Sequence, residues 1–249
     1  MESSRQSRYV ILAAFFGFFA LSTPIMLKLL PGIMKTQMPD FPPELMQFDT
    51  AQCMQNYIKN IYQLGNIVMA LTLMGILAEE RTGGKLVFPI SQGAGAAEIV
   101  GAKLAHYIAA VAGIVFAASM VNYYYSTMFF PDNGSLMGAA VQCASLLALY
   151  FATRVVLVTF ASALFARPMA AGLATILISF LEAIAVSFPR LKPLAAYNLV
   201  VLATEAASGQ APEMPWAMVT SLAIQASLLV LATILRMRRL DILPGLERV

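Results

Sequence analysis

Long apolar runs separated by short polar segments dominate this chain. A helix needs about 20 mostly apolar residues to cross the hydrocarbon core of a bilayer. Six runs meet this requirement, and they predict membrane-spanning helices over residues 9–30, 58–78, 102–123, 136–165, 168–188 and 216–235. The pattern therefore predicts an all-α, polytopic membrane protein. Because no internal repeat is visible, we expect one membrane domain over residues 1–249.

Two of the connecting segments carry a helical pattern of their own. On one side of the membrane, residues 189–215 are bounded by prolines, and residues 194–207 within them are apolar enough for a helix. This helix either lies on the outer leaflet or re-enters the bilayer, which requires protein or water to satisfy its backbone. The other segment follows the second run.

Basic residues between the runs predict the orientation of the helices, since cytoplasmic loops carry more Lys and Arg than external loops. With six spans, both termini share one side. That side holds ten of the 16 basic residues, the opposite side holds five, and Arg154 lies within a run. We therefore expect a multi-pass protein of the cell membrane with both termini in the cytoplasm.

Composition agrees with this interpretation. Of the 249 residues, 59% are hydrophobic and only 12% charged, and the mean hydropathy is +0.75. A soluble domain has about 25% charged residues, so a soluble enzyme is excluded. A net charge of +3 does not favour nucleic acid as a partner, and two cysteines are too few for a disulfide framework or a metal cluster.

The cytoplasmic segment between the second and third spans mixes apolar and charged residues. Glu79, Glu80 and Arg81 stand where a helix leaves the membrane, and Gly83 and Gly84 interrupt that helix. We expect a short amphipathic helix over residues 85–88, ended by Pro89, and a new helix that starts at residue 96. A short helix presented between two spans suits docking into a groove on a soluble partner.

The run EERTGGKLVFPISQGAGAAEIVGAKL, residues 79–104, resembles the signature of type-2 ATP-binding-cassette (ABC) exporter permeases. The family has an acidic residue after the second span, then Gly-x-Leu, Pro-[Ile/Val/Leu]-Ser and Gly-x-Lys in that order. Here these elements are Glu79 or Glu80, residues 84–86, residues 89–91 and residues 101–103. The six spans and the helical segment before the last span match the family as well.

The resemblance implies a function and a set of partners. It describes a permease subunit that pairs with a second copy or a related permease and with separate cytoplasmic ATPase subunits, which bind ATP and Mg. Such a subunit is a transporter component and not an enzyme itself. The ATPase-coupling residues implied by the resemblance are Glu79, Glu80, Arg81, Lys85, Leu86, Phe88, Pro89, Ile90 and Ser91.

No nucleotide-binding loop is encoded in this chain. Such a loop needs Gly-x-x-x-x-Gly-Lys-[Ser/Thr], whose backbone N–H groups hold phosphates. The single Gly-Lys pair is Gly84–Lys85, with Glu79 five residues before Gly84 and Leu86 after the lysine. We therefore expect no cofactor on this chain, and ATP hydrolysis on a partner.

Two ionisable residues lie inside predicted spans. Arg154 precedes Pro168 by 14 residues and Glu182 follows it by 14, so both are at equal depth on adjacent antiparallel helices. We expect them to form an intramembrane ion pair. It is either a clamp between two helices or part of a transport path, and in a stand-alone secondary transporter these two residues would couple ion movement to transport.

Overall fold

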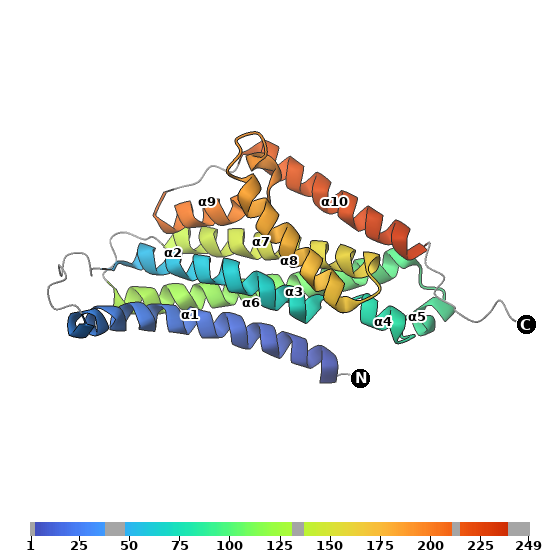
Figure 1. Cartoon of the computed structure of the whole chain (residues 1–249), viewed down its shortest axis with the longest axis horizontal. Coiled ribbons are helices and arrows are strands. Elements are labelled where there is room, and N and C mark those ends of the chain that lie inside the picture. The colour runs from blue at the N-terminus through green and yellow to red at the C-terminus, as the bar shows by residue number, and fades with distance from the viewer. Residues whose placement is uncertain (1–2, 38–47, 131–136, 211–214, 239–249) are drawn as a thin grey trace, which may run out of the picture. The chain divides into compact units, whose positions relative to one another are not determined.

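The computed structural model describes residues 3–37, 48–130, 137–210 and 215–238. Every regular element in these ranges is a helix (Figure 1). In chain order they are α1 (Ser3–Gln37), α2 (Thr50–Asn60), the π-helix η2 (Ile61–Gly65), α3 (Asn66–Leu73), α4 (Ala78–Thr82), α5 (Val87–Ser91), α6 (Ala96–Phe129), α7 (Met137–Leu164), α8 (Pro168–Ala185), the 3-10 helix η3 (Lys192–Leu194), α9 (Asn198–Ala207) and α10 (Trp216–Arg238).

Six helical stretches in the described residues are long and apolar enough to cross a membrane, which confirms the predicted all-α, polytopic fold. They are Ser7–Thr36, Thr50–Arg81, Ala96–Phe129, Met137–Leu164, Pro168–Ala185 and Trp216–Arg238. Residue 136, the first of the predicted fourth span, and both chain ends lie outside the described residues.

The helix bounds differ from the prediction where polar turns continue an apolar helix. The first helix runs on through Pro24 and Pro31. The third begins at Ala96, which confirms the helix start predicted there and lies six residues before the predicted span. Hydropathy marks the apolar part of a helix, whereas backbone hydrogen bonds continue into its polar ends. The second span is also not one regular helix, because the π-helix η2 interrupts it.

The chain divides into two compact units. The first consists of Met1–Gly65, Ala112–Tyr150 and Asn198–Met214. In it α2 packs against α1 and α9, and a seam of polar contacts runs through the interior. Asn122 Nδ2 donates to Ala20 O at 3.2 Å and Ser126 Oγ lies 3.1 Å from Cys53 Sγ. Such contacts join helices in a membrane, where burial of apolar surface provides little drive.

The apolar segment before the last span forms α9, most of whose residues are buried. It packs against α2, and Gln55 Nε2 donates to Ser208 Oγ at 2.8 Å just after α9 ends. Contact with α2 provides the protein surroundings that a re-entrant helix requires.

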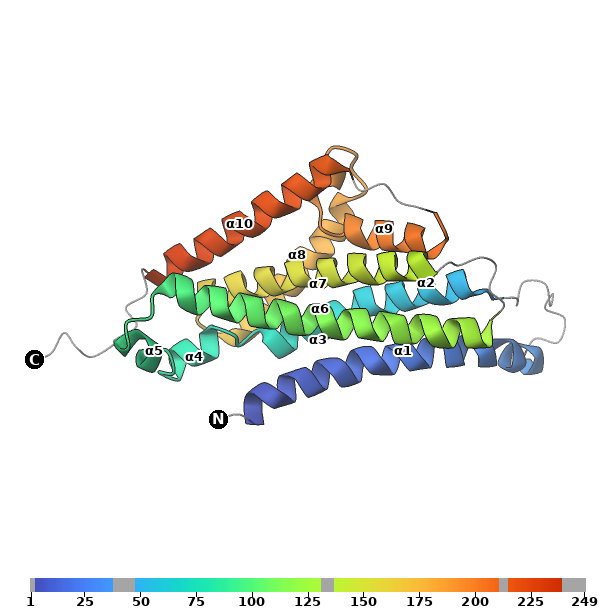
Figure 2. The same ribbon diagram turned by 180° about the vertical axis from the view of Figure 1, so that it is seen from behind.

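The second unit consists of Asn66–Val111, Phe151–Tyr197 and Pro215–Val249. Here α3 packs against α8, and α10 packs against η3. A Cβ atom on Gly172 would stand 3.2 Å from Met74 Sδ, so the glycine permits the close approach of α8 to the end of α3. Figure 1 and Figure 2 both place α4 and α5 beside the start of α6. All residues of the candidate site belong to this unit.

Candidate functional site

Ser162, near the end of α7, caps the start of α4. Its Oγ accepts hydrogen bonds from the backbone N–H groups of Leu77 at 3.0 Å and Ala78 at 2.9 Å. The first N–H groups of a helix have no partner within it, and Leu77 provides no side-chain cap. The serine therefore supplies from another helix what the local sequence lacks.

Arg81 fastens α4 to the same helix end. Its Nη1 donates to Ala163 O at 3.2 Å and its Nη2 to Phe165 O at 3.3 Å. The last carbonyl groups of a helix lack partners and carry partial negative charge, so a cation is favourable there. Arg81 thus faces the protein and closes the end of α7.

A lysine from α6 also holds α4. Lys103 Nζ forms an ion pair with Glu80 and donates to Ile76 O at 3.0 Å. The side chains of Lys103 and Glu80 are 13% and 15% exposed, so the pair is largely shielded from solvent. Together with Ser162 and Arg81, this pair attaches α4 to both α6 and α7, and we call the four residues the α4 bracket.

The short helix α5 follows a tight turn at Gly84, whose φ of +66° lies in the left-handed region that favours glycine. Leu86 is buried at 1% exposure, whereas Val87 is 37% and Phe88 69% exposed. The helix that follows the bracketed α4 therefore presents two apolar side chains, Val87 and Phe88, outward.

The expectation that Pro89 ends this helix is wrong, because Pro89 lies inside α5, which runs to Ser91. Proline is tolerated in a first helical turn, where its missing N–H would have no partner within the helix. The helix thus starts two residues later than predicted, at Val87.

The predicted coupling residues divide into two groups. Glu80, Arg81 and Leu86 face the protein, as described above. Pro89 and Ile90 are half-buried, and the exposed residues are Glu79, Lys85, Phe88 and Ser91. The two adjacent acidic residues therefore differ in their surroundings, since Glu80 faces Lys103 and Glu79 is exposed.

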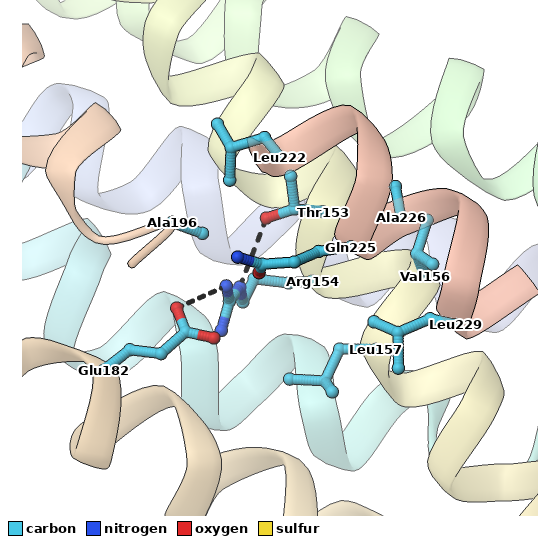
Figure 3. Close-up of a pocket in the computed structure, with 10 residues that line it drawn as sticks. All are labelled: Thr153, Arg154, Val156, Leu157, Glu182, Ala196, Leu222, Gln225, Ala226 and Leu229. Atoms are coloured by element: carbon cyan, nitrogen blue, oxygen red, sulfur yellow. Dashed lines mark hydrogen bonds and ion pairs between the residues drawn. The ribbon is translucent and has the colours of Figure 1, made fainter. Parts of the chain in front are cut away.

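Arg154 and Glu182 form an ion pair between α7 and α8. Arg154 Nη2 lies 2.7 Å from Glu182 Oε2 (Figure 3), and Arg154 Nη1 donates to Ser179 Oγ at 3.2 Å. The arginine side chain is 3% exposed and the glutamate side chain 23%. A buried guanidinium in a span needs a counter-charge and further acceptors, and α8 supplies both.

A cavity of about 30 Å³ adjoins this pair. Its lining combines the pair and Thr153 with side chains of α7 and α10 and with Ala196; the residues are Thr153, Arg154, Val156, Leu157, Glu182, Ala196, Leu222, Gln225, Ala226 and Leu229 (Figure 3). This volume accommodates a water molecule or two and not an organic substrate.

Sequence reasoning missed Ser162 and Gln225, and it named Lys103 only within the Gly-x-Lys element and not as the partner of Glu80. Gln225 lines the cavity and its Nε2 donates to Leu194 O at 2.7 Å. A polar residue within an apolar run is the signal that could have singled out Ser162 and Gln225. Their partners could not be found this way, because they lie 85 and 31 residues away.

Among the described residues, no group of three or more His, Cys, Asp and Glu side chains is placed to hold a metal ion. The single histidine of the chain, His106, has its ring against that of Tyr107, with centroids 5.6 Å apart.

Comparison of the chain with protein-family models, with curated proteins and with solved structures gives no match.

Proposed function

We propose that this chain is the membrane-spanning permease subunit of an ABC transporter. Export is the direction of transport that we favour. The observation that carries the proposal is the α4 bracket together with the exposed Phe88. A short helix that presents an apolar side chain between two spans is suited to a groove on a soluble protein. The attachment of the adjoining α4 to two long helices is suited to force transmission.

The bracket gives coupling a physical route. A displacement of α5 by a partner passes through Arg81 and Ser162 to α7, and through Glu80 and Lys103 to α6. Separate ATPase subunits, which bind ATP and Mg, supply the displacement. The permease pairs with a second copy or a related permease to complete the path, with both termini and α5 in the cytoplasm of a cell-membrane protein.

Affinity capture tests this proposal. The tagged chain is isolated from its native membranes in mild detergent, and mass spectrometry identifies proteins that are captured in stoichiometric amount. We expect a protein with a phosphate-binding loop, and we expect Phe88→Ser to abolish its capture. Phe188→Ser is the matched control, because Phe188 is also exposed, at 57%, but lies after α8 and not on α5.

Capture of no such protein with a well-folded wild-type chain would overturn the proposal. The second candidate would then be a stand-alone, ion-coupled secondary transporter. The observation that favours it is the buried Arg154–Glu182 pair beside a cavity large enough for water. Transport driven by an ion gradient in vesicles that hold this chain alone would support it.

A further inference from the structure

Residues 188–194, here called the basic loop, follow α8 and lead into η3. Arg190 and Lys192 are both exposed, and no acidic residue occurs in residues 186–197. Neither side chain has a hydrogen-bond or ion-pair partner among the described residues. The loop therefore presents two positive charges that the described part of the chain does not neutralise.

Exposed apolar side chains accompany these charges in the loop and at the start of α10. Within the basic loop Phe188 is 57%, Leu191 43% and Leu194 50% exposed, and at the start of α10 Trp216 is 82% exposed. Aromatic residues gather at membrane–water interfaces, where the ring meets acyl chains and the polar edge meets headgroups. This combination fits the boundary between acyl chains and phosphates.

The backbone of the loop is equipped for a region with little water. Ser221 Oγ donates to Pro193 O at 3.0 Å, and Gln225 Nε2 donates to Leu194 O at 2.7 Å. Leu191 N and Lys192 N both donate to Phe188 O. Irregular backbone near the hydrocarbon core needs such internal partners, so α10 holds the loop in a form that can lie within the headgroup layer.

We propose that the basic loop binds the phosphate groups of anionic phospholipids, with Phe188 and Trp216 in the adjoining acyl region. The guanidinium of Arg190 can hold two phosphate oxygens and Lys192 adds a point charge. External loops are poor in Lys and Arg, so two basic residues only two positions apart, Arg190 and Lys192, call for a local reason on that side. The inference rests on the chain spanning a bilayer and not on an ATPase partner.

Trp216 is the single tryptophan of the chain and reports on the lipids beside it. The full-length protein is placed in vesicles of phosphatidylcholine with a minor fraction of phosphatidylglycerol. Bromine, which quenches tryptophan fluorescence, is carried on the acyl chains of one lipid or the other at equal molar fraction. Both leaflets have the same composition, so the orientation of the protein does not affect the result.

We expect brominated phosphatidylglycerol to quench Trp216 at least about twofold more than brominated phosphatidylcholine, since each basic residue attracts anionic lipid. The variant Arg190→Gln/Lys192→Gln should bring the two lipids to equal quenching. Lys59→Gln, which removes an exposed charge from α2, should keep the excess. Unchanged quenching by brominated phosphatidylcholine in each variant verifies that Trp216 has not moved.

Equal quenching of the wild-type protein by both lipids would overturn the proposal, as would an excess that survives in the double variant. Absence of quenching by either lipid would show Trp216 outside the acyl region and would overturn it too. None of these outcomes changes the result of the ATPase capture, so the two proposals fail separately.

Discussion

At the scale of single residues, the Arg154–Glu182 pair shows how a charge is accommodated in an apolar helix. The guanidinium of Arg154 is buried and has Glu182 and Ser179 as partners. Attraction within a buried pair roughly offsets the cost of removing both charges from water, so removal of one partner is far more harmful than removal of both. This asymmetry distinguishes a structural clamp from a transport residue.

We expect Arg154→Met to lower the free energy of unfolding by about 3–5 kcal/mol, because Glu182 is left without its counter-charge. Arg154→Met/Glu182→Met should recover most of this loss. Denaturation of the detergent-solubilised variants by SDS measures both values. A double variant no more stable than the single one would contradict the clamp.

The same double variant tests the functional role of the pair. In an ABC permease in which the pair is only a clamp, the stable double variant should keep transport near the wild-type rate. In an ion-coupled transporter it should lose ion-driven transport, because no ionisable side chain of the pair is left. Transport assays at matched protein amounts in membranes distinguish the two outcomes.

At the scale of elements, α4 depends on its neighbours. It has five residues and no side-chain cap of its own, and an isolated helix this short is not stable in water. The α4 bracket supplies the missing hydrogen bonds from α7 and α6, so α4 is held by tertiary contacts and not by helix propensity.

Ser162→Ala should therefore loosen α4 locally. Two backbone N–H groups lose their acceptor, and each buried unsatisfied group costs about 1–3 kcal/mol. Hydrogen exchange at Leu77 and Ala78 should become faster while the amides in the middle of α7 stay unchanged. Ser145→Ala is the matched control, since Ser145 is exposed on the same helix and bonds only to Val141 O. Equal exchange in both variants would show that Ser162 does not cap α4.

The adjacent glutamates should behave differently. Glu80→Lys places a second cation against Lys103 and should lower both the melting temperature and the capture of an ATPase. Glu79→Lys alters an exposed side chain and should reduce the capture with little change in melting temperature. If Glu79→Lys leaves the capture intact, Glu79 does not contact the partner.

At the scale of the whole molecule, six apolar helices can cross a membrane in either of two opposite orientations. The bias of basic residues favours both termini and α5 in the cytoplasm. The two native cysteines, Cys53 and Cys143, are both free and buried. An introduced cysteine can therefore be labelled over a low background.

Cysteine labelling in intact cells tests the orientation. A membrane-impermeant maleimide should modify Lys192→Cys directly and Ser91→Cys only after permeabilisation, because both positions are exposed but on opposite sides of the expected bilayer. The reverse pattern would invert the orientation and remove α5 from the reach of a cytoplasmic ATPase.

The sequence by itself determined the number of long apolar helices and the pairing of Arg154 with Glu182. Both depend on local information, since hydropathy is a property of each segment and equal depth follows from helical rise across one hairpin. Reliance on local information also explains why the predicted helix ends differ from the observed ones. Polar end turns and the π-helix in the second span carry no hydropathy signal.

Only the tertiary structure decided which residues of the segment between the second and third spans face the protein. Glu79 and Glu80 are alike in sequence, but Lys103 of α6 pairs with Glu80 and leaves Glu79 exposed. Ser162 caps α4 from 85 residues away. Such contacts depend on how separate helices pack, so a pattern read along one segment does not contain them.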